Sequence, residues 1–184
     1  MTPKPTTRAP FAVSGRSATY ALIGAALYGL LGLFVMTLGV LIIRPGFALV
    51  PFFGYSFGPL AGFVTGFVGQ AIVEAIGGIT PADSWAHGLA SGLAGLVAGL
   101  AAWYVPRLVR GTLVRRAIGG GIAGIVGAAI GGLALLLHNT GGTDVGSLIV
   151  DTYVPITVGN ALVAIVLVPV LVFAWDPLSE SLAG

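Results

Sequence analysis

The stretch from residue 17 to residue 106 contains only three charged side chains, Arg44, Glu74 and Asp83. Over the whole chain, 57% of residues are hydrophobic and 8% are charged, whereas about 25% of the residues of a typical soluble domain are charged. A water-exposed surface needs more charge than this to stay dispersed. The sequence therefore predicts an all-α integral membrane protein, with lipid around most of the chain.

A helix needs about 20 apolar residues to cross a bilayer, and several segments approach this length. We predict spans at about 18–42, 59–77, 84–105, 117–137 and 149–174, and a shorter or broken apolar segment at 46–57. Pro51 and Gly54 interrupt the shorter segment. We expect the loops to be GGITPADS, PRLVRGTLVRR and HNTGGTDVGS.

The basic residues predict the orientation. Seven of the eight fall in two groups, Lys4, Arg8 and Arg16 before the first span, and Arg107, Arg110, Arg115 and Arg116 between the fourth and fifth helices. Positively charged loops stay in the cytoplasm, so an even number of crossings must separate the groups. The shorter segment then counts as a crossing. This predicts a glycine-rich bundle of six transmembrane segments over 18–176, with cytoplasmic tails at 1–17, which we expect to be disordered, and at 177–184.

This topology places most of the remaining polar side chains in the outer half of the membrane. Buried charge costs about 2.5–3.5 kcal/mol on insertion scales, and Gln70 and Glu74, four residues apart, share one helix face. We predict that they face an outward-open pocket, with Arg44 either pairing with Glu74 or accepting the charge of a ligand. The alternative is an interfacial Glu74 without a function. The candidate substrate-binding residues are Arg44, Gln70, Glu74, Trp85, His87, Asp151, Tyr153 and Asn160.

Other chemistry is not predicted. The sequence has no P-loop motif and no G-x-S-x-G nucleophile motif, so we expect neither an enzyme nor a cofactor. His87 and His138 are both predicted at the outer face, and we interpret each as a single interfacial histidine rather than a metal ligand. The net charge of +2 is too small for a nucleic-acid partner. Phe47, Trp85 and Tyr153 are candidates for stacking on a ring.

Small residues recur at four-residue spacing inside several spans. This spacing makes a flat helix face that another helix can approach closely. For the third to fifth spans we expect packing inside the bundle. The first span carries Ala21, Ala25 and Gly29 near its cytoplasmic end, and its spacing fits either a partner helix or packing inside the bundle.

One segment, RPGFALVPFFGYSFGPLAGFVTGFVGQAIVEAIGG, resembles the substrate-binding S components of energy-coupling factor (ECF) transporters. The resemblance rests on Phe57-Gly58-Pro59 with Gly62, Gly66 and Gly69, on Trp85 followed by Gly88 and Gly92, and on VDTYVPITVGNAL at 150–162. It covers roughly residues 18–174. Some members carry an asparagine after the tryptophan that this chain lacks.

The resemblance implies a six-helix subunit of the prokaryotic plasma membrane that binds a vitamin or micronutrient on its outer side. Its implied partners are a transmembrane coupling subunit, two cytosolic ATPases and membrane lipid. In this family an A-x-x-x-A face of the first helix meets the coupling subunit, and Ala21 and Ala25 match it. We expect a small aromatic or heterocyclic nutrient as substrate. A stand-alone small-solute transporter or channel, and a membrane assembly protein without a ligand, remain as alternatives.

Overall fold

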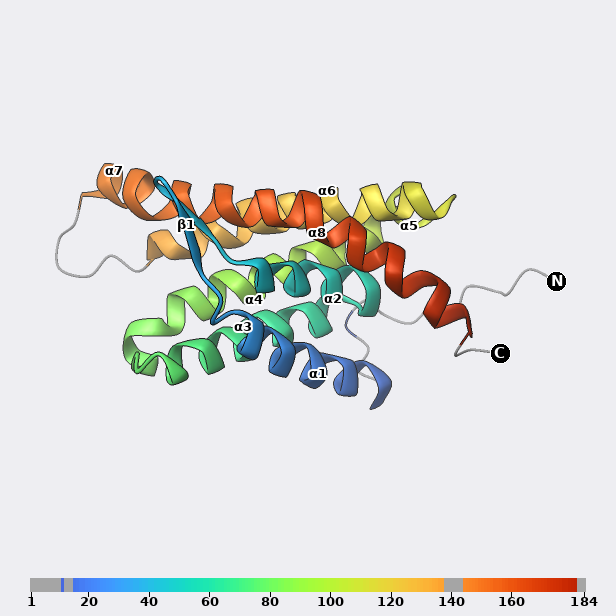
Figure 1. The fold of residues 1–184 in the computed structure, drawn as a ribbon, viewed down its shortest axis with the longest axis horizontal. Coiled ribbons are helices and arrows are strands. Elements are labelled where there is room, and N and C mark those ends of the chain that lie inside the picture. The colour runs from blue at the N-terminus through green and yellow to red at the C-terminus, as the bar shows by residue number, and fades with distance from the viewer. Residues whose placement is uncertain (1–10, 12–14, 138–143, 182–184) are drawn as a thin grey trace.

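The computed structural model describes residue 11 and residues 15–137 and 144–181, without the side chains of 16, 81–84 and 180. Most of the predicted N-terminal tail, and His138 and Asn139, lie outside the described residues. The longer helices are α1 (Gly15–Leu31), α2 (Leu49–Phe57), α3 (Pro59–Ile76), α4 (Pro81–Tyr104), α6 (Leu113–Gly132) and α8 (Val154–Ser181). They lie side by side along the long axis of the molecule (Figure 1).

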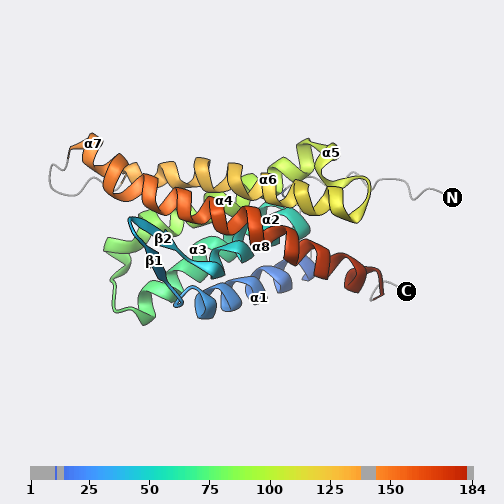
Figure 2. The ribbon, with the colours of Figure 1, turned by 45° about the horizontal axis from the view of Figure 1, so that its top comes forward.

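Short elements connect these helices. They are the strands β1 (Met36–Leu38) and β2 (Leu41–Ile43), the 3-10 helices η1 (Pro45–Ala48) and η2 (Leu133–Leu137), the single turns α5 (Pro106–Val109) and α7 (Val145–Leu148), and the π-helix η3 (Ile149–Tyr153). The two strands form an antiparallel hairpin in which Met36 pairs with Ile43. The hairpin crosses the bundle from the end of α1 to α8, close to α7 (Figures 1 and 2).

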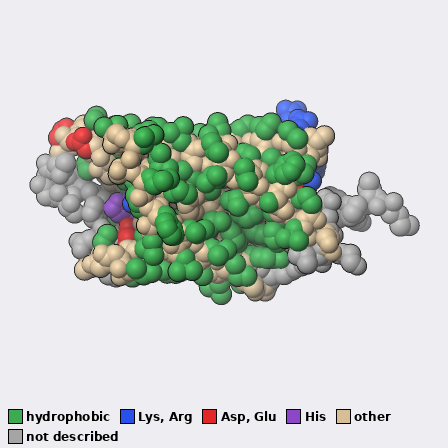
Figure 3. All heavy atoms as spheres, in the orientation of Figure 1, with side chains coloured by type: hydrophobic (Ala, Val, Ile, Leu, Met, Phe, Trp, Pro, Cys, Tyr) green, Lys and Arg blue, Asp and Glu red, His purple; other side chains and the backbone are tan. Residues whose placement is uncertain are grey.

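The prediction of a helical membrane protein is confirmed. In the described part of the chain, four helical stretches are long and apolar enough to cross a membrane: Pro59–Ile76, Trp85–Tyr104, Leu113–Leu136 and Val145–Ser179. Ser17–Leu31 is apolar but shorter, and α2 has only nine residues. The surface matches this assignment, because hydrophobic side chains cover the middle of the molecule and charged ones gather at its two ends (Figure 3).

The predicted first span at 18–42 is wrong in its second half. Helix α1 ends at Leu31, and the chain then forms the hairpin. Gly39 occupies the turn with φ of 61° while Val40 keeps a negative φ, which is the pattern of a two-residue type II′ turn. An apolar run rich in β-branched residues fits a buried helix or a strand equally well, so composition alone did not separate the two.

Two predicted loops are also shorter than expected. Helix α4 already begins at Pro81, within the predicted loop GGITPADS, because proline is favoured in the first turn of a helix. Helix α6 begins at Leu113, inside the predicted loop between the fourth and fifth spans, and the Thr112 hydroxyl caps it by accepting from the Arg115 amide at 3.4 Å.

Helices α3 and α4 pack backbone to backbone. A Cβ added to Gly62 would overlap the carbonyl group of Gly95, and a Cβ added to Gly66 would overlap that of Ser91. Helix α6 meets α4 in the same way, because a Cβ at Gly127 would overlap the carbonyl oxygen of Ala94. These glycines therefore serve the packing inside the bundle that their spacing predicts.

The small-residue face of α1 is also used inside the chain. Ala21 and Ala25 are 5% and 2% exposed, and a Cβ at Gly29 would meet the Ile72 side chain of α3. The Ala21 carbonyl accepts a hydrogen bond from the Thr65 hydroxyl at 3.5 Å. Ala21, Ala25 and Gly29 therefore pack against α3 inside this chain. The exposed surface of α1 lies on its opposite face.

Because α3 and α4 pack so closely, we predict that one methyl group added at their contact destabilises the protein. Gly95→Ala should destabilise the protein by about 1–3 kcal/mol, because the new methyl group would overlap the Gly62 backbone. Gly88→Ala is the matched control on the same helix, since its methyl group would lie 3.5 Å from the Phe67 ring, an ordinary contact. Thermal unfolding of the two variants in detergent measures the difference. Equal midpoints would contradict the proposed packing.

Candidate functional site

A polar cavity lies at the end of the bundle near α7 and the hairpin, away from α5. Residues from α1, η1, α3, α4, α6, η2 and α8 surround it. Its lining consists of Tyr28, Arg44, Phe47, Gln70, His87, Ala90, Ser91, Ala94, Ala128, Gly132, Leu135, Ile156 and Asn160. Most of the charged and amide side chains of the bundle interior meet here.

One wall is a hydrogen-bonded network contributed by α1, α3 and α4. The Tyr28 hydroxyl donates to Gln70 Oε1 at 2.6 Å, and Gln70 Nε2 donates to Glu74 Oε1 at 3.0 Å. His87 Nδ1 lies 3.3 Å from the same Glu74 oxygen. The Ser91 hydroxyl donates to Gln70 Oε1 at 3.5 Å. Gln70 and Glu74 are 2% and 5% exposed, so this network replaces the water that these groups lose on burial.

The helical repeat explains how this wall forms. Gln70 and Glu74 are one turn apart on α3, and His87 and Ser91 are one turn apart on α4, so each pair shares a face. Gly69 lets α1 approach, because a Cβ there would overlap the Tyr28 ring. The hydroxyl of Tyr28 therefore reaches the amide of Gln70.

The facing wall comes from η1 and α8. Arg44 is the residue that precedes η1, and Asn160 lies three residues after Thr157 on α8. The hairpin is held against α8 because Gly159 has no side chain, and a Cβ there would overlap the Ile42 carbonyl. This contact brings Arg44, which follows the hairpin, to the same cavity as Asn160.

Both walls carry buried polar atoms that have no hydrogen-bond partner in the described part of the chain. Arg44 Nε and Asn160 Oδ1 belong to residues that line the cavity, and Glu74 Oε2 and Thr157 Oγ1 belong to residues next to the lining. A buried polar group without a partner costs free energy, and a ligand that satisfies it recovers that cost. The enclosed space is about 20 Å³, roughly what one water molecule needs, so an organic ligand requires the two walls to separate.

A comparison with known proteins shows which family the chain belongs to. A model of the family described as ECF-type riboflavin transporter, S component, matches residues 13–176. The chain belongs to this family. It is therefore a substrate-binding S subunit of an ECF transporter in the plasma membrane, and it is not an enzyme. No solved structure matches the chain at a significant level.

In this S component, five of the eight predicted site residues come together. Arg44, Gln70, His87 and Asn160 line the cavity, and Glu74 is bonded to two of them. Glu74 is buried rather than water-exposed, and its role in binding is still a prediction. The predicted pairing of Glu74 with Arg44 is wrong, because His87 takes that place.

The other three predicted residues lie elsewhere. Trp85 is 44% exposed and Asp151 is exposed. Tyr153 packs against α6, where its hydroxyl donates to the Ala129 carbonyl at 3.1 Å. Of the aromatic residues predicted to stack on a ring, only Phe47 lines the cavity. The roles of all eight in binding stay predictions.

Sequence reasoning missed Tyr28, Ser91 and Thr157. Tyr28 was overlooked because a first span to residue 42 places it near the middle of the membrane, whereas α1 ends three residues after it. Ser91 and Thr157 each share a helix face with a residue that was selected, His87 and Asn160. Their spacing of three or four residues from a selected residue could have identified both of them from the sequence.

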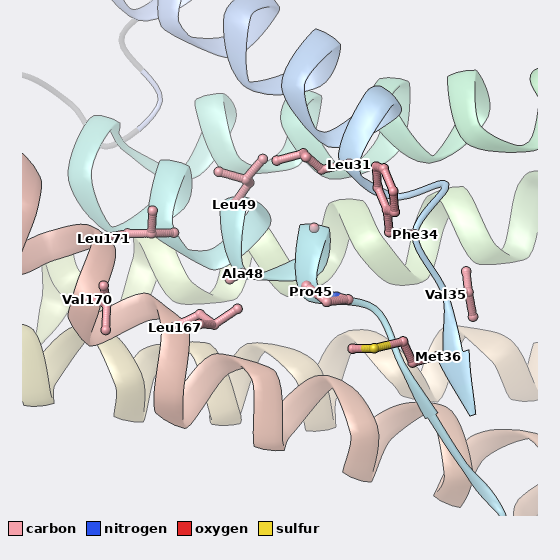
Figure 4. Close-up of a pocket in the computed structure, with 11 residues that line it drawn as sticks. Leu31, Phe34, Val35, Met36, Pro45, Ala48, Leu49, Leu167, Val170 and Leu171 are labelled. Atoms are coloured by element: carbon pink, nitrogen blue, oxygen red, sulfur yellow. The ribbon is translucent and has the colours of Figure 1, made fainter. Parts of the chain in front are cut away.

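A larger cavity of about 510 Å³ lies between α1, the hairpin, η1 and α8 (Figure 4). Its lining consists of Leu31, Phe34, Val35, Met36, Pro45, Gly46, Ala48, Leu49, Leu167, Val170 and Leu171. None of these side chains donates or accepts a hydrogen bond. This cavity suits hydrocarbon and offers nothing to orient a polar solute, so we place the functional site in the smaller polar cavity.

The network predicts that the Tyr28 hydroxyl stabilises the fold. Tyr28→Phe should lower stability by about 1 kcal/mol, which shifts the unfolding midpoint by about 2–4 °C in a chain of this size. Tyr20→Phe is the control, since Tyr20 lies on the same helix and makes ring contacts but no hydrogen bond in the described structure. Differential scanning fluorimetry of both variants measures the shift. A larger loss in Tyr20→Phe would contradict the network.

Proposed function

We propose that this S component crosses the membrane six times, with both termini in the cytoplasm, and binds a small vitamin-like nutrient in the polar cavity from the outside. The observation that carries the proposal is the buried network with its unpartnered polar atoms, at the end of the bundle opposite α5. The arginines between α4 and α6 lie at the α5 end, and basic residues favour the cytoplasm.

The direction of the helices supports six crossings. Helix α1 begins and α8 ends at the same end of the molecule as α5 (Figure 1). Helix α2 returns the chain toward that end after the hairpin, although its nine residues alone are too short to span a bilayer. The 3-10 helix η1 directly precedes α2 and lengthens this segment by four residues. Six segments then alternate in direction.

Transport requires partners in this proposal. The chain has no P-loop, so the energy of ATP must come from ATPase subunits acting through a coupling subunit. We place the contact of the coupling subunit on the exposed face of α1, which includes Leu22, Ala26 and Leu30, because the Ala21 face is covered by α3.

Ligand capture tests the binding function. The chain is purified alone in mild detergent from cells grown on rich medium, and bound small molecules are identified by mass spectrometry. Riboflavin, which the family description names, is the first compound to add to empty protein. We expect one compound per chain and about tenfold weaker binding in Asn160→Ala, through the loss of a buried hydrogen bond.

Asp144→Asn is the matched control for this experiment, because Asp144 also precedes the α8 segment, is exposed and does not line the cavity. We expect this variant to bind like the unmodified chain. A protein that stays empty with a panel of vitamins would overturn the binding function and favour a membrane assembly protein.

Uptake tests the role of α1. Ala26→Trp should reduce nutrient uptake by cells that express the whole transporter by about tenfold or more, because a bulky side chain prevents close helix packing, and it should leave the dissociation constant unchanged. Val126→Trp on the exposed face of α6 is the control. Uptake by the chain alone in liposomes would support a stand-alone transporter instead.

A further inference from the structure

Arg44 is the one basic residue of the sequence outside the two groups at residues 4–16 and 107–116. It lies between β2 and η1 and lines the polar cavity together with Tyr28, Gln70 and Asn160. Its Nε atom is buried without a hydrogen-bond partner in the described part of the chain. A cation in this position is costly unless something satisfies it.

The carboxylate of the cavity does not neutralise Arg44. Glu74 Oε1 is approached by His87 Nδ1 at 3.3 Å and by Gln70 Nε2 at 3.0 Å. Among the described residues, no carboxylate oxygen lies within 4.0 Å of the Arg44 guanidinium, since the ion pairs found there join His87 to Glu74 and Arg116 to Asp176. The cavity therefore has a carboxylate paired with a histidine and a guanidinium that lies near the Tyr28 hydroxyl but has no carboxylate within 4.0 Å.

These two groups belong to different walls. Arg44 lies on the η1 and α8 side with Asn160, while Glu74 and His87 come from α3 and α4. The hydrogen-bonded chain from Tyr28 through Gln70 leads to Glu74. A ligand between the walls therefore meets the Arg44 guanidinium on one side and, on the other, the Gln70 amide and the His87 imidazole, with the Glu74 carboxylate behind them.

We infer that the substrate of this chain carries an anionic group that pairs with Arg44, together with an N–H or O–H group that donates to Asn160 Oδ1. This rests on the proposed function and narrows it to carboxylate- or phosphate-bearing nutrients. Guanidinium suits such a group because its planar donors match two anionic oxygens. Riboflavin is uncharged at neutral pH and leaves Arg44 without a counter-ion.

The test compares matched acidic and neutral compounds. The purified chain in lipid nanodiscs is titrated with nicotinate and nicotinamide, with pantothenate and panthenol, and with flavin mononucleotide and riboflavin, and binding is followed by calorimetry. We expect one acidic member to bind about 10- to 100-fold more tightly than its neutral partner, as a charged hydrogen-bonded pair does. This comparison uses the unmodified chain and does not depend on the folding of any variant.

Variants then test whether Arg44 is the residue that causes the preference for the acidic compound. Arg44→Gln should weaken binding of the acidic member by about 10- to 100-fold and leave the neutral member nearly unchanged. Arg44→Lys should keep part of the preference, because it keeps the charge. Arg110→Gln, an exposed arginine between α5 and α6, is the control and should behave like the unmodified chain.

The outcomes separate the two proposals. Tight binding of a neutral member that Arg44→Gln does not change would overturn the anionic substrate and leave the binding function intact. A preference for the acidic member that survives in Arg44→Gln would also overturn the role of Arg44. Failure of every compound to bind would overturn the binding function and the anionic substrate with it.

Discussion

The backbone contact between α3 and α4 sets the geometry on which the site depends. Gly66 meets the Ser91 carbonyl directly, and this contact determines how far α4 is shifted along α3. The same shift puts Ser91 beside Gln70, and His87, one turn earlier, beside Glu74. A larger side chain at Gly66 would separate the helices and break the polar network. The close approach of the two helix backbones and the placement of the polar side chains therefore depend on the same contact.

The hairpin and the short helix α2 complete the other wall. Because α1 stops at Leu31 and α2 has nine residues, the chain between them lies across the bundle instead of along it. Gly159 allows the hairpin to rest on α8, which brings Arg44 and Phe47 to the cavity. The walls differ accordingly, since one is built on closely packed helices and the other on a short hairpin and one face of α8.

Much of the site was predictable from the sequence because helical spacing is regular. Gln70 and Glu74 were predicted to share a face and do so, and His87 and Asn160 were predicted near them. The hairpin was not predicted, because the run from residue 33 to residue 43 is apolar in either conformation. Trp85 and Asp151 were selected for being polar or aromatic near a helix end, and a helix end offers positions toward the bundle and away from it.

The sequence by itself determined that this chain lies in a membrane, that its helices pack through glycine faces, and that most of its polar residues gather away from the four arginines at 107–116. These properties follow from composition and from spacing along the chain, which are local. Only the tertiary structure decided which groups pair. Glu74 has His87 rather than Arg44 as its partner, and Ala21 and Ala25 are buried inside the chain, where the Ala21 carbonyl bonds to α3. The physical reason is that pairing depends on the rotation and shift of one helix against another, and these are set by contacts between residues far apart in the sequence.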